Sequence, residues 1–225
     1  MASIRVAILE DHQSIVDGYL YRLNDDRGIE IVGCAHYGED LEPLLQSQPV
    51  DVLILDLVVP TSADNQQPFP LFHLIPELFK KYPVLRILVI SMLTESTLVN
   101  SLVDMGISGY IGKEDSQSIQ QLKQIINIIA TGGVYFSQDI YQGLRQNSAS
   151  LKVPTLTVRQ LEALSLCAAY PEASTNSIAA QMRVSPSTLR NLLSAAYERL
   201  DVRTRMAAIV KAQKMGILTA APGRK

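Results

Sequence analysis

The sequence has no tryptophan, only two cysteines among 225 residues, and no apolar run of the length needed to span a bilayer. Cys34 and Cys167 lie far apart in apolar surroundings, so we interpret both as buried thiols of a reducing compartment rather than as a redox pair. The first residues lack the charged and then apolar pattern of a secretory leader. These absences favour a soluble, cytoplasmic protein without membrane contact.

Charged residues are also scarce, and their two signs are unevenly distributed. They make up 19% of the chain, with a net charge of −2. Residues 1–150 hold 9 Lys/Arg against 18 Asp/Glu, a balance of −9, whereas residues 151–225 hold 11 against 4, a balance of +7. An acidic part joined to a small basic part indicates different partners, and a polyanion suits the second part. A basic surface can also be an ordinary solvated face.

The first part of the chain alternates between strand and helix patterns. Predicted strands cover Ile4–Leu9, Ile31–Tyr37, Val52–Leu55, Arg86–Ser91 and Ser108–Ile111. Predicted helices cover Gln13–Asn24, Asp40–Gln46, Pro70–Tyr82, Ser96–Asp104 and Ser116–Ala130. Five strands that alternate with five helices predict an α/β fold with a doubly wound, five-stranded parallel sheet of the flavodoxin-like kind.

The basic part of the chain shows no strand pattern. Predicted helices cover Val158–Ala169, Thr175–Met182, Pro186–Leu200 and Arg203–Met215. Short connections between helices of this length, with a basic balance, predict a small all-α helix-turn-helix domain. We therefore expect one domain over residues 1–137, a linker over 138–155 and the helical domain over 156–220.

Polar residues follow the ends of several predicted strands. Asp56 interrupts the apolar stretch VDVLILDLVVP, where an unpaired carboxylate is costly to bury. Glu10 and Asp11 end the first strand, Ser91 ends the fourth, and Lys113 closely follows the fifth. In an open parallel sheet, ligands bind outside these carboxyl ends. Three carboxylates there favour a small hard cation such as Mg²⁺, and a phosphoryl group on Asp56 would use the cation, Lys113 and Ser91.

Each of these residues also has an ordinary interpretation. Asp11 can be an N-cap, Asp56 can start a turn, and Lys113 can be a solvated charge. Their joint occurrence at the ends of different strands favours a site. His12 lies beside them, but one histidine without helical partners is more typical of a surface position than of a metal ligand. We find no nucleophile–base pair, so we expect no enzyme beyond the chain's own phosphoryl transfer.

Residues 1–137 resemble the receiver domain of bacterial two-component response regulators. The stretches that carry the resemblance are VAILEDHQSIVDGYL, LILDLVVP, ILVISM, GYIGK and ATGGVYFS. The resemblance implies that Glu10, Asp11, Asp56 and the backbone carbonyl of Val58 hold Mg²⁺. It also implies that Asp56 accepts a phosphoryl group from a sensor histidine kinase or a small phosphodonor.

Two further residues acquire a role from the same resemblance. Ser91, with Lys113, would bind phosphoryl oxygens. Tyr110, three residues before the lysine, matches the aromatic side chain that swings inward on activation. Without the resemblance, Tyr110 is simply a half-buried packing residue. Phosphorylation would then shift the face formed by the fourth predicted helix, the fifth strand and the fifth helix, and would promote dimerisation or free the recognition helix.

One predicted helix of the basic part carries residues suited to DNA. Ser185 is a good N-cap and Pro186 fits the first helical position. Polar side chains share the face opposite the apolar stripe of this helix: Ser187, Arg190, Asn191 and Ser194. Arginine can bind guanine and asparagine can bind adenine in the major groove. The ordinary alternative is a solvated helix face.

The stretches LTVRQLEALSLCAA and SIAAQMRVSPSTLRNLLSAAYERLDVRTRMAAI resemble the helix-turn-helix of LuxR/NarL-type regulators. The resemblance implies that Arg190, Asn191 and Ser194 contact bases. Further cationic side chains are available for DNA phosphates: Arg183, Arg199, Arg203, Arg205 and Lys211. With the first part, this indicates a NarL/FixJ-type response regulator that acts as a dimer. Its implied partners are double-stranded DNA, a sensor histidine kinase, a second copy of the chain and RNA polymerase.

The chain departs from the pattern of this family in three places. The loop TSADNQQPFP after Pro60 is several residues longer than usual and lacks glycine. Leu192 stands where the family has a histidine, and Thr175-Asn176-Ser177 replaces a more charged run. Two alternatives therefore stay open: a phosphorylation-independent DNA-binding regulator whose receiver serves only for dimerisation, and a protein-interaction module that no longer binds DNA.

Overall fold

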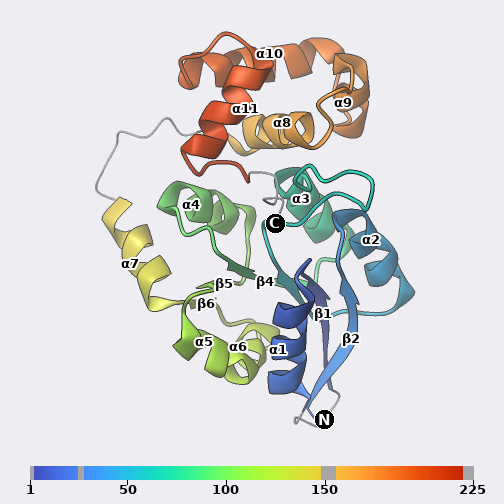
Figure 1. Ribbon diagram of the computed structural model, residues 1–225, viewed down its shortest axis with the longest axis vertical. Helices are drawn as coiled ribbons and strands as arrows, with labels where there is room; N and C mark the ends of the chain where they lie inside the picture. The colour runs from blue at the N-terminus through green and yellow to red at the C-terminus, as the bar shows by residue number, and fades with distance from the viewer. Residues whose placement is uncertain (1–2, 25–27, 148–155, 220–225) are drawn as a thin grey trace.

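The computed structural model describes residues 3–24, 28–147 and 156–219 (Figure 1). The last eight residues of the predicted linker and position 220 lie outside these ranges. The described chain folds into an α/β part, formed by residues before 148, and a helical part, which lies above it in Figure 1. The predicted division between an α/β fold and a small all-α domain is confirmed.

Among the described residues, six strands form one sheet in the order β2-β1-β3-β4-β5-β6, and every pairing is parallel. The strands are β1 Ile4–Leu9, β2 Ile29–Ala35, β3 Val52–Leu55, β4 Arg86–Ser91, β5 Gly109–Gly112 and β6 Tyr135–Phe136. The predicted parallel sheet is confirmed, but the predicted number of five strands is wrong. The additional strand β6 pairs with β5. It has only two residues, so it is too short to produce a periodic pattern in the sequence.

Helices cover both faces of the sheet. One face packs against α1 Gln13–Leu23 and α6 Leu122–Ala130, and the other packs against α2 Gly38–Ser47, α3 Leu71–Lys81 and α4 Ser96–Met105. All four residues of the central strand β3 are buried because neither face of the sheet is open to solvent. Within the register of β1 and β3, Leu9 lies opposite Leu55, so the residues that follow both strands meet at one edge.

The predicted helix Ser116–Ala130 is two helices in the structure. The short α5 Ser116–Gln120 is separated from α6 by Gln121, whose backbone leaves the helical range. Asp115 caps α5, and its carboxylate accepts a hydrogen bond from the backbone N–H of Ser118 at 3.0 Å.

A further helix, α7 Gln138–Asn147, lies in the stretch that the sequence analysis assigned to the linker. It packs against α4 and β5, with Ile140 buried. Gly143 allows the close approach of α4, because a Cβ there would lie 2.9 Å from the Ser96 Oγ. The helix was not predicted because most of its ten residues are polar, and short helices of this kind depend on tertiary packing.

The helical part contains α8 Val158–Ala169, α9 Thr175–Gln181, α10 Pro186–Arg199 and α11 Arg205–Lys214. Each begins at a Ser or Thr whose side chain accepts a hydrogen bond from a backbone N–H in the first turn. The predicted N-cap Ser185 and the first-turn Pro186 of α10 are confirmed. Four capped helices joined by short connections match the predicted helix-turn-helix architecture.

The structure also bears on the scarce residue types. Cys34 and Cys167 are both free, and burial raises the pKa of each thiol. Cys167 is buried, whereas Cys34 is only half-buried. In the described ranges, no helix has the length and apolar composition that crossing a membrane requires.

Candidate functional site

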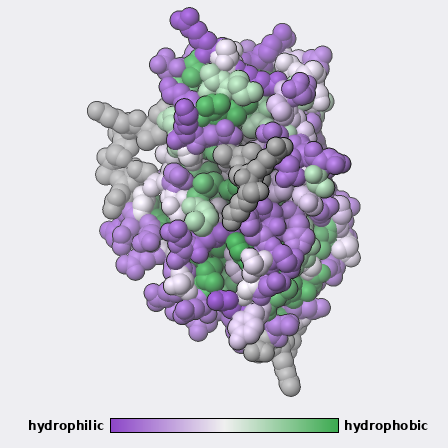
Figure 2. Space-filling view, in the orientation of Figure 1, coloured by the Kyte–Doolittle hydropathy of each residue, from purple (hydrophilic) through white to green (hydrophobic). Residues whose placement is uncertain are grey.

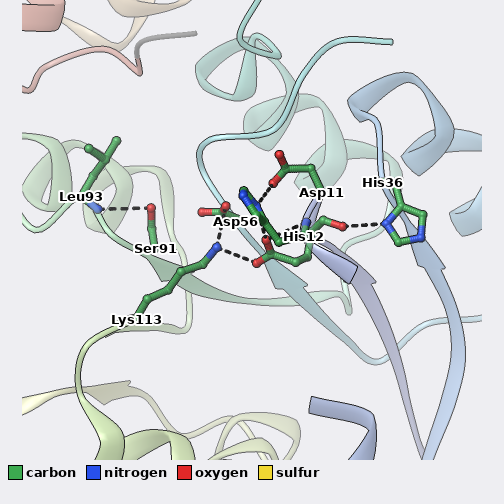
Figure 3. A network of polar contacts seen from close by, with 8 residues as sticks. Asp11, His12, His36, Asp56, Ser91, Leu93 and Lys113 are labelled. Carbon is green, nitrogen blue, oxygen red and sulfur yellow. Dashed lines mark hydrogen bonds and ion pairs between the residues drawn. The ribbon is translucent and has the colours of Figure 1, made fainter. Parts of the chain in front are cut away.

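The polar residues at the strand ends gather at one edge of the sheet. Glu10 and Asp11 follow β1, Asp56 follows β3, Ser91 ends β4 and Lys113 follows β5 (Figure 3). The parallel register places these positions side by side, because all the strands end at the same edge. The structure therefore assembles the predicted cluster from four separate strands.

A buried lysine joins two of the carboxylates. The Lys113 Nζ lies 2.7 Å from the Glu10 Oε2 and 2.8 Å from the Asp56 Oδ2. Figure 3 shows the end of the Lys113 side chain directed toward Asp56. Exposed fractions of these side chains are 10% for Lys113, 1% for Glu10 and 4% for Asp56. The alternatives of a turn residue and a solvated charge are thus wrong for Asp56 and Lys113. The Asp56 N–H donates to the Leu9 carbonyl at 2.9 Å, which ties the start of this loop to β1.

Burial and mutual charge shift the protonation equilibria in this cluster. Burial raises the pKa of Glu10, and the neighbouring Asp56 raises it further against the opposing effect of Lys113. Burial alone would lower the pKa of Lys113, but the neighbouring Asp56 and Glu10 outweigh it, so the pKa of Lys113 lies above its usual value. The lysine therefore stays charged between two acidic side chains.

The remaining unsatisfied groups suit a divalent cation. The Asp56 Oδ1 is buried and has no hydrogen-bond partner within the described chain. Ligand atoms of Glu10, Asp11 and His12 lie within 4.8 Å of one another. Carboxylate oxygens of this kind are what Mg²⁺ prefers, and the second oxygen of Asp56 lacks the partner that a buried carboxylate needs. The residues present therefore fit a magnesium ion.

Two histidines are closer to the cluster than the sequence suggested. The His12 Nδ1 lies 2.8 Å from the Asp11 Oδ1, and His12 rather than Asp11 is the N-cap residue of α1, without a side-chain cap bond. The alternative of Asp11 as an N-cap is therefore wrong. The His36 Nδ1 donates to the Glu10 carbonyl at 3.0 Å, from the segment after β2. No sequence spacing links His36 to Glu10, because only the sheet brings them together.

The expected switch residues lie on the neighbouring strands β4 and β5. Ser91 is fully buried, and its Oγ accepts a hydrogen bond from the Leu93 N–H at 3.4 Å. Tyr110 is also fully buried, and its hydroxyl donates to the Leu93 carbonyl. Both side chains thus bind the same short loop after β4. Tyr110 is directed into the protein rather than half-exposed.

The polar face of α10 is open to solvent. Ser187, Arg190, Asn191 and Ser194 are all exposed, while Leu189 and Leu193 on the other side are buried. The Arg190 Nε donates to the Pro186 carbonyl at 3.2 Å, within the same helix. Leu192, which stands where the family has a histidine, packs against the domain core. This exposed set of side chains on α10 is called the recognition face below.

The predicted phosphate contacts differ in their surroundings. Arg203 and Arg199 are both exposed, and among the contacts of Arg199 its Nη1 donates to the Gln160 Oε1 at 3.1 Å. Arg183 faces the Glu77 Oε2 of α3 at 3.5 Å. Arg205 is half-buried, and its guanidinium donates two bonds to the Ala173 carbonyl at 3.0 and 3.1 Å. The prediction that Arg205 is available for phosphates is thus not supported, because it holds the connection before α9.

Comparisons with known proteins agree with this arrangement. A model of the response regulator receiver domain matches residues 6–127, which is more than half of the chain. The chain is 28% identical over 220 residues to the probable transcriptional regulatory protein NarL of Mycobacterium tuberculosis, covering 96% of both proteins. It is 26% identical over 215 residues to the transcriptional regulatory protein DesR of Bacillus subtilis, covering 95% of this chain and 98% of DesR.

Among solved structures, the chain resembles RcsB of Salmonella enterica serovar Typhimurium bound to the promoter rprA, with a TM-score of 0.65. The likeness covers 93% of this chain and 98% of that one, at 21% identity, which shows the shared fold. The matched receiver domain, the assembled acidic cluster and the full-length relatives lead to one assignment. The chain belongs to the response regulators that contain a receiver domain, and within them to the NarL/FixJ type.

Proposed function

We propose that Asp56 accepts a phosphoryl group from a sensor histidine kinase or a small phosphodonor and thereby controls DNA binding by α10. The observation that carries the proposal is the buried Asp56 carboxylate, which has Lys113 on one oxygen and, among the described residues, no hydrogen-bond partner on the other. A buried carboxylate that lacks a partner is expensive, and it persists where function needs it. In the reaction, an Asp56 oxygen forms a bond to phosphorus, and the bond from phosphorus to the imidazole nitrogen of the donor breaks.

Glu10, Asp11, Asp56 and the Val58 carbonyl would hold Mg²⁺ at this site. When bound, the ion supplies positive charge against the phosphoryl oxygens. Lys113 already lies at hydrogen-bond distance from Asp56 and holds a second charge there. Ser91 ends β4 at the same edge of the sheet, and its hydroxyl would donate to a phosphoryl oxygen while its Oγ accepts from the Leu93 N–H. Movement of Ser91 toward the phosphoryl group would shift the loop after β4, to which the Tyr110 hydroxyl is also bonded.

The recognition face would bind the major groove of double-stranded DNA. Arg190, Asn191 and Ser194, with Ser187, offer the donors that read base edges, and all four are exposed. Arg203, Arg199 and Arg183 would contact phosphates and position the helix.

A dimer would place two recognition helices on a roughly two-fold site. Figure 2 shows apolar side chains on the upper, helical part of the molecule as well as on the receiver. On α11, Met206 and Val210 are 59% and 40% exposed, and their spacing of four residues puts them on one face of the helix. We propose this surface of α11 as one contact between two copies of the chain. We also propose that the protein is cytoplasmic and that its receiver domain ends at or just after α7.

The test is the intact mass of the purified protein after incubation with acetyl phosphate and Mg²⁺, beside an Asp56→Asn control. We expect one phosphoryl adduct in the wild type and none in the control. Binding to a DNA duplex recovered from a random-sequence pool is then compared with and without the adduct. A wild type that gains no adduct but binds the duplex would support the phosphorylation-independent alternative instead.

A further inference from the structure

Helix α8 is buried on all sides, which is unusual for a helix at the edge of a small domain. Every residue of the helix from Gln160 to Ala169 is buried. One side of α8 packs against α9, α10 and α11 of its own domain, and the other side packs against α3 of the receiver (Figure 1). From Gln160 to Ala169 the helix exposes no side to solvent, so it depends on neighbours on both sides. The helix-turn-helix domain therefore uses the receiver to bury part of α8.

The inserted loop after Pro60 reaches this helix. Its two ends are joined by a bridge between Pro60 and Pro68 and by a bond of 2.9 Å from the Thr61 N–H to the Gln67 carbonyl. The base of the loop is bound to the start of α2, where the Gly38 N–H donates to the Pro60 carbonyl at 2.9 Å. The two ends of this ten-residue loop are therefore hydrogen-bonded to each other, and the loop is attached to the start of α2.

The tip of the loop contacts the end of α8. The Asn65 Nδ2 donates to the Ala169 carbonyl at 3.1 Å. Ala169 is the last residue of α8, and carbonyls in the final turn of a helix have no partner within the helix. The Asn65 Oδ1 accepts from the Gln67 N–H at 3.0 Å, which fixes the orientation of the amide. The receiver therefore supplies a polar cap to a helix of the other domain.

A second polar contact lies beside the first. Glu77 of α3 accepts from Lys80 on its own helix and faces the Arg183 Nη1 at 3.5 Å across the two domains. Arg183 lies in the turn between α9 and α10 with a positive φ of 53°, and its side chain is 81% exposed, so this ion pair is a surface contact. The contacts of Asn65 and Glu77 add polar links between the domains to the packing of α3 against α8.

The docked arrangement does not cover the recognition face. Helix α10 lies on the side of its domain away from the receiver in Figure 1, and Arg190, Asn191 and Ser194 are exposed. Separation of the domains would gain no access for DNA. It would instead expose the α3-facing side of α8 to water, which is unfavourable.

We propose that the inserted loop 61–70 is an interdomain clasp, and that the protein binds DNA with its two domains docked rather than after domain opening. The second half of this inference rests on the DNA binding proposed above. Phosphorylation would then act on the pairing of two docked copies. A domain held by the clasp keeps its recognition helix at a fixed place in the dimer. When one recognition helix binds DNA, the effective concentration of the other helix at the second half of the site is therefore higher.

The test uses the full chain with the variant Asn65→Asp, which keeps the acceptor for Gln67 and removes the donor to Ala169. The matched control is Gln66→Ala, because the Gln66 amide bonds only to Ser62 and Ala63 inside the loop. Glu77→Gln removes the charge of the second contact. Hydrogen exchange of the α8 amides measures docking, and fluorescence anisotropy measures affinity for a duplex recovered from a random pool by the wild type.

We expect Asn65→Asp to speed exchange in the last turns of α8 by about 2- to 10-fold, from the loss of one hydrogen bond. Its affinity for the duplex should equal that of the wild type or be weaker. Tighter DNA binding by Asn65→Asp would overturn the proposal, because opening would then unmask the recognition face. Unchanged exchange in α8, or equal acceleration by Gln66→Ala, would overturn the clasp. If the wild type recovers no duplex, the proposed function fails, and the exchange arm still decides the clasp.

Discussion

The two functional regions of this chain hold their charges in opposite ways. In the receiver, the Glu10 and Asp56 side chains are at most 4% exposed, and the Lys113 Nζ lies within 2.8 Å of both carboxylates. On α10, the Arg190 and Asn191 side chains are exposed to solvent. Buried charges are strongly coupled because little solvent screens them, whereas exposed charges are nearly independent. The first region should therefore respond to substitution with large changes in stability, and the second with changes in DNA affinity alone.

The largest effect is expected from Lys113→Met, which leaves two buried carboxylates without their cation. Without Mg²⁺, the free energy of unfolding should fall by about 3 kcal/mol. Urea denaturation measures it, with Lys80→Met as the control, since Lys80 is 65% exposed and pairs on the surface of α3. A Lys113→Met variant as stable as the control would contradict the coupling inferred here. Added Mg²⁺ should recover part of the loss.

Arg190→Ala should show the opposite behaviour. The affinity for DNA should fall by about 1–3 kcal/mol if the guanidinium contacts a base edge, while the unfolding free energy changes by less than about 0.5 kcal/mol. Fluorescence anisotropy and urea denaturation give the two quantities. The matched control is Glu198→Ala, an exposed residue near the end of the same helix, which should not weaken binding. An equal loss of DNA affinity in both variants would show that Arg190 makes no specific contact with the DNA.

Arg203 and Arg205 allow the comparison to be made within one segment. Arg205→Ala should destabilise the protein by about 1.5 kcal/mol, because its guanidinium donates two bonds to the Ala173 carbonyl. Arg203→Ala should leave stability unchanged and reduce the slope of log affinity against log salt by about 1, as expected for one phosphate contact. Thermal unfolding and salt titrations of binding separate the two. Reversed results would show that Arg205 is the phosphate contact after all.

The smallest effect concerns an ion pair at the opposite edge of the same sheet. Asp51 accepts bonds of 2.7 to 2.9 Å from the Arg5 guanidinium and backbone, and these hold the pKa of Asp51 below its usual value. Because the pKa is lower in the folded state, the stabilisation is present above pH of about 3.9 and is lost as the pH falls through the folded value. Asp51→Asn should therefore flatten the acid limb of stability against pH. A variant that keeps the wild-type slope below pH of about 4 would contradict this assignment.

Much of the receiver could be predicted from the sequence because its strands are short, apolar and separated by polar residues. The position of Asp56 within VDVLILDLVVP already indicated a site, since a carboxylate in such a stretch needs a partner. That the polar residues meet at one edge followed from the rule that parallel strands end together, whereas the strand order and the pairing of Lys113 with Glu10 and Asp56 came from the structure. The N-cap Ser185 was likewise a local signal, because a cap depends on residues within one turn.

Other features gave no signal along the chain. Helix α7 is mostly polar and forms against α4, and β6 exists only as a neighbour of β5. The bond of His36 to Glu10 and the bonds of Arg205 to Ala173 join residues with no characteristic spacing. The insertion after Pro60 was evident in the sequence as an anomaly, but its contact with Ala169 joins residues 104 positions apart.

The sequence by itself determined the elements whose residues carry their own reason to form: buried strands, capped helices, and an acidic residue set at strand ends. The tertiary structure decided which charges meet, how far each is buried, and which arginines remain free for a partner. Local propensity and periodicity depend on residues that are close together in the sequence, so they can be recognised from the sequence alone. Charge coupling, helix capping across domains and burial depend on distances in space, which only the packed molecule defines.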